Sequence, residues 1–119
     1  MKKMINTVAK GTRKEKACAD VLKEMGYTQD KIKIKDKPIS LIWKVIRTKY
    51  CSLDLFGLFD VCALAPDGSH LLFIQTKSNR CDAKTRDAIQ ALKMPKGCRK
   101  EIWIWKDRKY WIKEYYDYY

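Results

Sequence analysis

Two apolar runs separated by a short polar segment dominate the hydrophobic pattern of this chain. The first run, residues 56–65, contains a single charged residue, Asp60, and the second, residues 71–74, is unbroken. Residues 66–69 between them read Pro-Asp-Gly-Ser, a combination that favours a β-turn. Continuous apolar runs bounded by turn signals indicate strands that are covered on both faces. The pattern therefore predicts a buried β-hairpin.

Helical periodicity flanks the hairpin on both sides. Residues 12–15 have the Thr-x-x-Glu spacing of a capping box, and apolar residues follow at helical intervals up to Gly26, which occupies the usual position after a helix end. Residues 1–11 are then a basic lead-in. A second helix is predicted for residues 79–92, which contain the apolar residues Ala83, Ala88, Ile89 and Leu92. Pro95 stops this pattern shortly afterwards.

Three further strands are predicted at residues 39–47, 101–105 and 110–116. Residues 31–35 alternate between lysine and isoleucine, which is typical of a short exposed strand or of an extended basic loop. The order of elements is α-β-β-β-α-β-β. This order predicts a single α/β domain over residues 1–119, with a central mixed β-sheet flanked by helices.

The net positive charge of the chain bears on its binding partner. The chain has 26 Lys and Arg against 14 Asp and Glu, a formal net charge of +12, which favours a polyanionic partner, although a cationic surface that serves only solubility is the alternative. Cations are mixed with aromatic residues around Trp43 and Tyr50, as on surfaces that bind nucleic acids, although core aromatics beside solvated lysines are the alternative for each of them. The candidate nucleic-acid-binding residues are Lys44, Arg47, Lys49, Arg80 and Lys84.

Composition also excludes several classes of protein. The five cysteines form no CxxC pair, which favours reduced thiols and a cytoplasmic protein. The single histidine, His70, rules out a metal site built from several histidines. No apolar run approaches the length of a membrane span, so no membrane contact is expected.

The candidate chemistry lies at the ends of the hairpin strands. Side chains alternate along a strand, so Gln75 and Lys77 share one face and Thr76 takes the other. An antiparallel neighbour can bring Asp60 close to Gln75 and Lys77. Oxygen ligands at this density suit Mg²⁺ or Mn²⁺, and a nearby lysine can stabilise a metal-bound hydroxide. A structure with Asp60 and Lys77 on opposite faces of the sheet would contradict this site.

The arrangement resembles the PD-(D/E)XK, or restriction-endonuclease-like, superfamily of nucleases. Glu15 on the first helix, Asp60 on the first hairpin arm and residues 75–77 on the second fall where that family carries its motif. The segment 54–60 together with the Gln-Thr-Lys strand end is most similar to small phage and archaeal nucleases of the Holliday-junction-resolvase and VRR-NUC type. Gln75 departs from the family, which has an acidic residue there.

The resemblance implies a role for each site residue. Asp60 would be the central metal ligand, Gln75 the second, and the backbone carbonyl of Thr76 a third. Lys77 would position the attacking water and stabilise developing charge. Two acids have alternative roles: Glu15 would hold a metal-bound water or a second ion or else act as the capping-box acid, and Asp54 would supply missing charge or else only begin a strand.

We therefore expect a Mg²⁺- or Mn²⁺-dependent nuclease that hydrolyses phosphodiester bonds in DNA, with RNA as an alternative substrate. A structure-specific substrate, such as junction or branched DNA, is one option. The sequence leaves open a junction, a flap, plain duplex DNA or RNA, as well as the choice between endo- and exonuclease action. A homodimer is compatible with this function. The first alternative is a catalytically inactive nucleic-acid-binding module on the same fold. A less favoured one is an interaction protein that binds an acidic partner.

Overall fold

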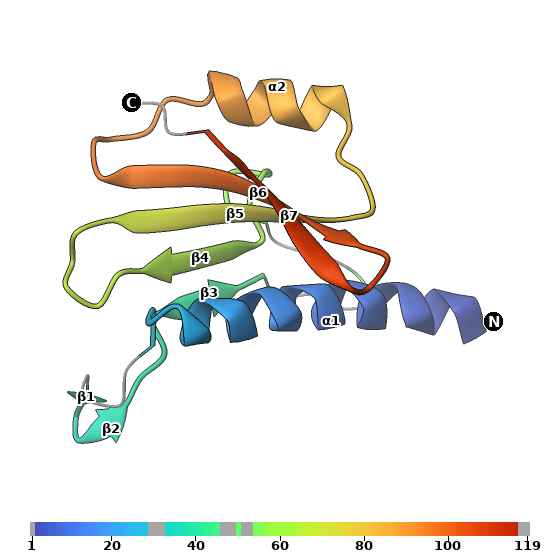
Figure 1. Cartoon of the computed structure of the whole chain (residues 1–119). Helices are drawn as coiled ribbons and strands as arrows, with labels where there is room; N and C mark the ends of the chain where they lie inside the picture. Colours follow the sequence, from blue (N-terminus) through green and yellow to red (C-terminus); the bar gives the residue numbers. More distant parts are fainter. Residues whose placement is uncertain (1, 29–32, 46–49, 51–53, 117–119) are drawn as a thin grey trace.

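A five-stranded mixed sheet lies between two helices in the computed structural model (Figure 1). The structure describes residues 2–28, 33–45, 50 and 54–116, and for residues 2–12 it describes the backbone alone. The strands of the sheet follow one another in the order β3-β4-β5-β6-β7. Their bounds are β3 Ile42–Lys44, β4 Val61–Leu64, β5 Leu71–Ser78, β6 Cys98–Lys106 and β7 Tyr110–Tyr115. The predicted class, a small α/β protein with a mixed sheet, is confirmed.

The first helix, α1 (Lys2–Glu24), begins ten residues before the predicted capping box. The expected basic lead-in at residues 1–11 is therefore wrong for residues 2–11, and Thr12 lies inside the helix. These residues include good helix formers and no proline, and the one glycine, Gly11, costs only about 1 kcal/mol relative to alanine. Because Thr12 is not an N-cap, Glu15 is not a capping-box acid.

The predicted end of α1 is confirmed in detail. Gly26 adopts a φ of +96°, which a glycine reaches without strain. The backbone N–H of Tyr27 donates to the carbonyl of Leu22 at 3.1 Å, and that of Gly26 donates to Lys23 at 3.1 Å. These two bonds form a Schellman motif, which satisfies carbonyls that the helix end leaves open.

The predicted hairpin is also present. β4 and β5 pair antiparallel, with Val61 opposite Ile74, and Gly68 in the connecting turn has a φ of +75°. The first arm is shorter than the apolar run, because the segment between Leu55 and Phe59 forms a tight turn closed by backbone bonds between those two residues. The strand proper begins only after Asp60.

A helical crossover joins the hairpin to the second half of the sheet. β5 runs parallel to β6 across α2 (Ala83–Ala91), and β6 turns back into the antiparallel β7. The helix begins later than residue 79 because Asn79 has a φ of +66° and Asp82 is the N-cap, accepting from the Thr85 N–H at 3.1 Å.

Residues 33–35 of the lysine-isoleucine segment belong to a separate two-stranded hairpin, and residues 31–32 lie outside the described part of the chain. β1 (Lys33–Ile34) pairs with β2 (Lys37–Pro38), and the hairpin extends away from the main sheet (Figure 1). This outcome favours the short exposed strand over the extended loop. Of the strand predicted at 39–47, only β3 is formed, and residues 46–47 lie outside the described part of the chain.

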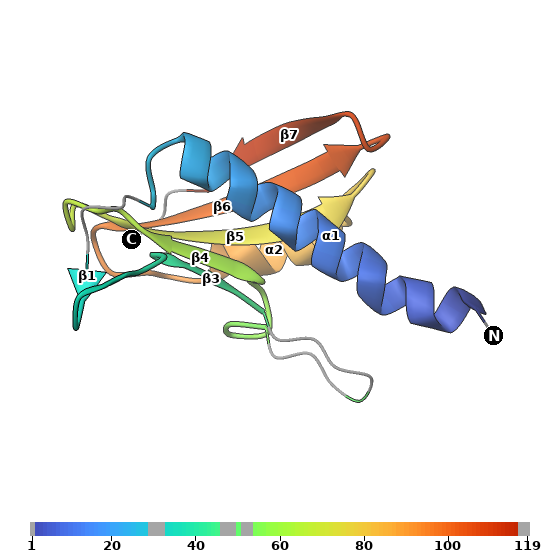
Figure 2. The same ribbon diagram turned by 90° about the horizontal axis from the view of Figure 1, so that it is seen from below.

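Each face of the sheet has its own apolar core, which shows to which face the core side chains of its strands point. On one face, α1 crosses the sheet (Figure 2) and its Cys18 and Leu22 pack with Ile74 and Trp103. On the other face, Ile89 of α2 packs with the apolar side chains Phe59, Phe73, Ile102 and Ile104. Side chains of β5 with even numbers therefore point to α1, and those with odd numbers point to α2.

Two expectations from composition can be compared with the described residues. Cys18, Cys62, Cys81 and Cys98 are free thiols, as predicted, whereas Cys51 lies outside the described residues. Neither helix in the described part of the chain has the length and hydropathy needed to span a membrane.

Candidate functional site

Gln75 and Lys77 share one face of β5, as the alternation predicts, and it is the α2 face. Phe73, two residues before Gln75, packs against Ile89 of α2, and the alternation continues unbroken through the parallel pairing with β6. Burial raises the pKa of the Cys81 thiol, and the positive charge of Lys77 opposes that rise. Lys77 therefore lies beside the start of α2.

Thr76 and Asp60 lie on the α1 side instead. Thr76 pairs with Trp103, a member of the core under α1. Its hydroxyl donates to Oδ2 of Asp60 at 2.7 Å, and its backbone N–H donates to Oδ1 at 3.0 Å. Asp60 is only 1% exposed. The expected convergence of Asp60 with Gln75 and Lys77 is therefore not met.

An irregularity in the strand explains this placement. Val61 is the partner of Ile74 in the ladder, yet the backbone N–H of Asp60 also donates to the Ile74 carbonyl, at 3.0 Å. Two successive residues thus face one partner, which is the pattern of a β-bulge. A bulge interrupts the alternation of side chains, so Asp60 points to the same face as Val61.

Glu15 lies on the same face as Asp60. It is 1% exposed and precedes Cys18 by three residues, so both side chains lie on the stripe of α1 that faces the sheet. Burial is the main cause that raises the pKa of the Cys18 thiol, and the charges of Asp60 and Glu15 add to it. Both carboxylates therefore lie near this thiol.

Opposing effects act on the pKa of the Asp60 carboxyl group. Burial raises the pKa of its carboxyl group, while the two hydrogen bonds from Thr76 and the charge of Lys14 lower it. The charge of Asp54 adds a smaller upward shift, which places Asp54 nearby. Oδ1 of Asp54 is buried and has no hydrogen-bond partner within the part of the chain that the structure describes. A buried oxygen without a partner is costly, and a cation is one of the groups that can satisfy it.

The expected metal-ligand set fits this geometry only in part. Gln75 belongs to the α2 face, and both oxygens of Asp60 already accept from Thr76. Among the described residues, no three His, Cys, Asp or Glu side chains gather closely enough to hold a metal ion. Mg²⁺ requires only one or two carboxylates when substrate phosphates complete its shell. The carboxylates that fit such an ion are those of Asp54 and Asp60, and Glu15 lies on the same face of the sheet.

A basic pocket adjoins these acids. It has a volume of about 410 Å³ and is lined by Arg13, Lys14, Ala17, Ser78, Asn79, Trp105 and Arg108. Among the described residues, three cationic side chains line it and no acidic side chain does. Lys14 connects the pocket to Asp60, because its charge lowers the pKa of that carboxyl group. A concave surface with one sign of charge concentrates ligands of the opposite sign.

Three elements contribute to the pocket, and Asn79 joins two of them. Its backbone N–H donates to the Trp105 carbonyl at 3.0 Å. Its side-chain Oδ1 accepts from the Asp107 N–H at 2.9 Å, in the turn between β6 and β7 that carries Arg108. The end of β5 therefore fixes the position of this turn opposite α1, which supplies Arg13 and Lys14.

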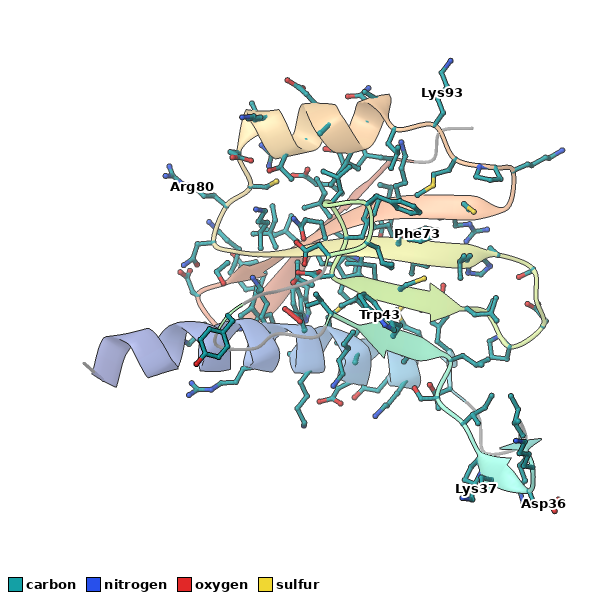
Figure 3. All side chains as sticks on the ribbon, turned by 180° about the vertical axis from the view of Figure 1, so that it is seen from behind. Asp36, Lys37, Trp43, Phe73, Arg80 and Lys93 are labelled. Atoms are coloured by element: carbon teal, nitrogen blue, oxygen red, sulfur yellow. The ribbon has the colours of Figure 1, made fainter. Side chains whose placement is uncertain are left out.

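The predicted nucleic-acid-binding residues lie elsewhere. Lys44 is exposed on β3, while Arg80 and Lys84 are exposed at the start of α2; Figure 3 shows Arg80 near that helix. None of these three lines the basic pocket, and Arg47 and Lys49 lie outside the described residues. The pocket residues were not predicted from the sequence. The mixture of Trp105, Arg108 and two lysines within residues 105–109 is a sequence signal that could have indicated a nucleic-acid-binding surface there.

Comparison with known proteins adds no assignment to this geometry. No protein-family model, curated protein or solved structure shows a significant match to the chain.

Proposed function

We propose that this protein binds nucleic acid along the α1 side of its sheet. The observation that supports this function best is the basic pocket, which Arg13, Lys14 and Arg108 line and to which none of the described acidic residues contributes a side chain. The formal net charge of +12 adds long-range attraction for a polyanion. Contacts of this kind grip phosphates and do not read the sequence of bases.

The arrangement of elements supports a restriction-endonuclease-like core as the fold. A helix with Glu15 precedes a hairpin whose first arm follows Asp60 and whose second arm carries Gln75, Thr76 and Lys77. A helix and a parallel strand then follow, which is the order that the family resemblance implies. The distribution of Asp60 and Lys77 over two faces favours the binding module over the expected active site.

Fluorescence anisotropy with labelled duplex and single-stranded DNA, over a series of salt concentrations, tests the binding. With about five phosphate contacts, the logarithm of the binding constant on duplex should fall with a slope near −4 against the logarithm of salt concentration. Absent binding, or binding that salt does not change, would contradict the proposal and favour a protein partner.

A metal-dependent nuclease is the second candidate function. The specific observation in its favour is the unpartnered Oδ1 of Asp54 near Asp60, beside a pocket suited to phosphate. Asp54 and Asp60 would hold Mg²⁺ or Mn²⁺ together with phosphates of the substrate, and the ion would supply Lewis-acid stabilisation of a phosphodiester undergoing hydrolysis. Arg13, Lys14 and Arg108 would hold the phosphates on either side.

Two measurements test this second candidate independently of one another. Calorimetric titration with MnCl₂ should show binding that Asp54→Asn weakens, because the variant removes the charge without changing the shape of the side chain. Gel assays on branched, single-stranded and duplex DNA should show cleavage with Mg²⁺ or Mn²⁺ and none with EDTA. Metal binding without cleavage would favour the binding module, and the absence of both would reject the nuclease.

A further inference from the structure

The aromatic wall of the basic pocket is held in place by other tryptophans. Trp105 is half-buried, and its ring lies 4.7 Å from that of Trp111, measured between centroids. Trp111 in turn contacts Trp103 at 5.6 Å, and the Lys113 ammonium lies 4.2 Å from the centre of a Trp103 ring. Packing of this kind fixes the orientation of Trp105, so little conformational entropy is lost when a ligand contacts it.

The cations of the pocket come from two elements, a helix and a turn. Arg13 is an exposed side chain on α1, whereas Arg108 belongs to a tight turn in which it has a φ of +58°. Asn79 fixes that turn through the Asp107 N–H. The pocket therefore combines an aromatic surface with cations from α1 and from the turn between β6 and β7.

The size and chemistry of the pocket match one type of ligand. A volume of about 410 Å³ lies within the range of sites that enclose a small molecule. A base and its phosphate offer a flat apolar face beside a negative charge. In a duplex the faces of the bases are stacked on their neighbours, so only an unpaired nucleotide presents both groups together.

We propose that this pocket holds an unpaired nucleotide of a nucleic-acid strand, with the base against Trp105 and the phosphate between Arg13, Lys14 and Arg108. This inference rests on the nucleic-acid binding proposed above, and it adds a preference for single-stranded or unpaired regions. Asn79 is a positioning residue in this site, because it acts through the turn that carries Arg108.

Two substitutions of Trp105 separate stacking from apolar packing. Trp105→Phe retains a smaller aromatic face, whereas Trp105→Leu retains apolar contact with Trp111 but has no flat ring. Anisotropy would be measured with a fluorescein-labelled oligo-dT strand and with a blunt duplex of equal length. Trp105→Leu should weaken binding of the single strand by about fivefold or more, Trp105→Phe should weaken it less, and duplex affinity should change by less than about twofold in both.

A pair of charge variants provides the matched control. Arg108→Asn removes a pocket cation with a residue that tolerates a positive φ, and Lys93→Asn removes an exposed cation after α2, on the far side of the sheet from α1 (Figure 3). The first should weaken binding of both probes, and the second should change neither by more than about twofold.

The outcomes separate the inference from the function on which it rests. If the parent protein binds neither probe, nucleic-acid binding itself is rejected. If it binds both probes but Trp105→Leu has no effect, or weakens single strand and duplex equally, the unpaired-nucleotide site is rejected while nucleic-acid binding stands. Circular dichroism of both Trp105 variants tests whether they are folded. If Trp105→Leu is unfolded, the effect of Trp105→Phe on single-strand binding decides whether the pocket holds an unpaired nucleotide.

Discussion

Asp60 and Lys77 lie on opposite faces of the central sheet. The Asp60 carboxylate accepts two hydrogen bonds from Thr76 under α1, whereas Lys77 lies beside Cys81 at the start of α2. An acid that holds a metal ion and a lysine that stabilises the attacking hydroxide must reach the same phosphate. This pair does not meet that condition, so our proposal places phosphate binding at the cations around the basic pocket.

The position of Gln75 yields the first prediction. Because Gln75 is on the α2 face and only 8% exposed, Gln75→Glu should not strengthen binding of Mn²⁺. The new carboxylate should instead lower the free energy of unfolding, since burying a charge without a partner is unfavourable. Calorimetric titration with MnCl₂ and urea unfolding measure the two effects. Tighter metal binding by the variant would contradict this prediction and indicate that Gln75 lies in a metal site.

The second prediction concerns Asp60 and pH. Burial raises the pKa of Asp60 above the usual value of 3.8, so the folded protein holds this proton more tightly than the unfolded chain does. The contribution of Asp60 to stability is therefore greatest below that usual value and falls as pH rises towards the folded pKa. Asp60→Asn has no charge to bury and escapes this loss.

Urea unfolding from about pH 4 to about pH 7 tests this expectation. The free energy of unfolding of Asp60→Asn, minus that of the parent protein, should increase with pH over this range. Asp87→Asn, an exposed position on α2, is the control and should show a constant difference. A constant difference for Asp60→Asn as well would mean that burial does not raise the pKa of this carboxyl group.

A buried lysine gives the third prediction. Lys100 is 0% exposed, and its ammonium donates to the carbonyls of Ile89, Gln90 and Leu92 at the end of α2. It thereby satisfies carbonyls that a helix end leaves open and places a positive charge near them. Lys100→Met keeps most of the side-chain volume but leaves these acceptors without a donor.

We expect Lys100→Met to lower the free energy of unfolding by about 1–3 kcal/mol, the usual cost of leaving buried polar groups unsatisfied. Hydrogen exchange should quicken at the end of α2 more than in β5. Lys93→Met, an exposed neighbour in sequence, should be neutral within about 0.5 kcal/mol. Equal stability of Lys100→Met and the parent would show that the three bonds have no net value.

The parts of the fold that the sequence predicted are those encoded by local patterns. The Gly26 cap, the turn at 66–69 and the unbroken apolar run of β5 each follow from a few adjacent residues. The start of α1 was missed because a capping-box pattern can also occur inside a helix. At Gly11 and Thr12, good helix formers on both sides outweighed a weak stop signal.

The arrangement of the candidate site could not be predicted from the simple alternation of side chains along a strand. The bulge at Asp60 adds one residue to one strand, and a shift of one residue moves a side chain to the other face. The pocket was missed for a different reason. Arg13 and Arg108 are far apart in sequence, and the bond from Asp107 to Asn79 that positions the turn is visible only in the folded chain.

Removal of two pocket cations tests whether the basic pocket binds the phosphates of a nucleic acid. A double variant, Arg13→Gln with Arg108→Asn, would be compared with the equally charged Lys93→Gln with Lys96→Asn, whose sites are exposed and outside the pocket. The measurement is the dependence of DNA affinity on salt concentration. If the pocket binds phosphate, the pocket variant should lose about tenfold or more in affinity and its slope should become shallower by about 2, since each lost contact removes about 0.9. The control should keep the slope of the parent protein. Equal changes in the two double variants would contradict the account, because net charge alone would then explain the binding.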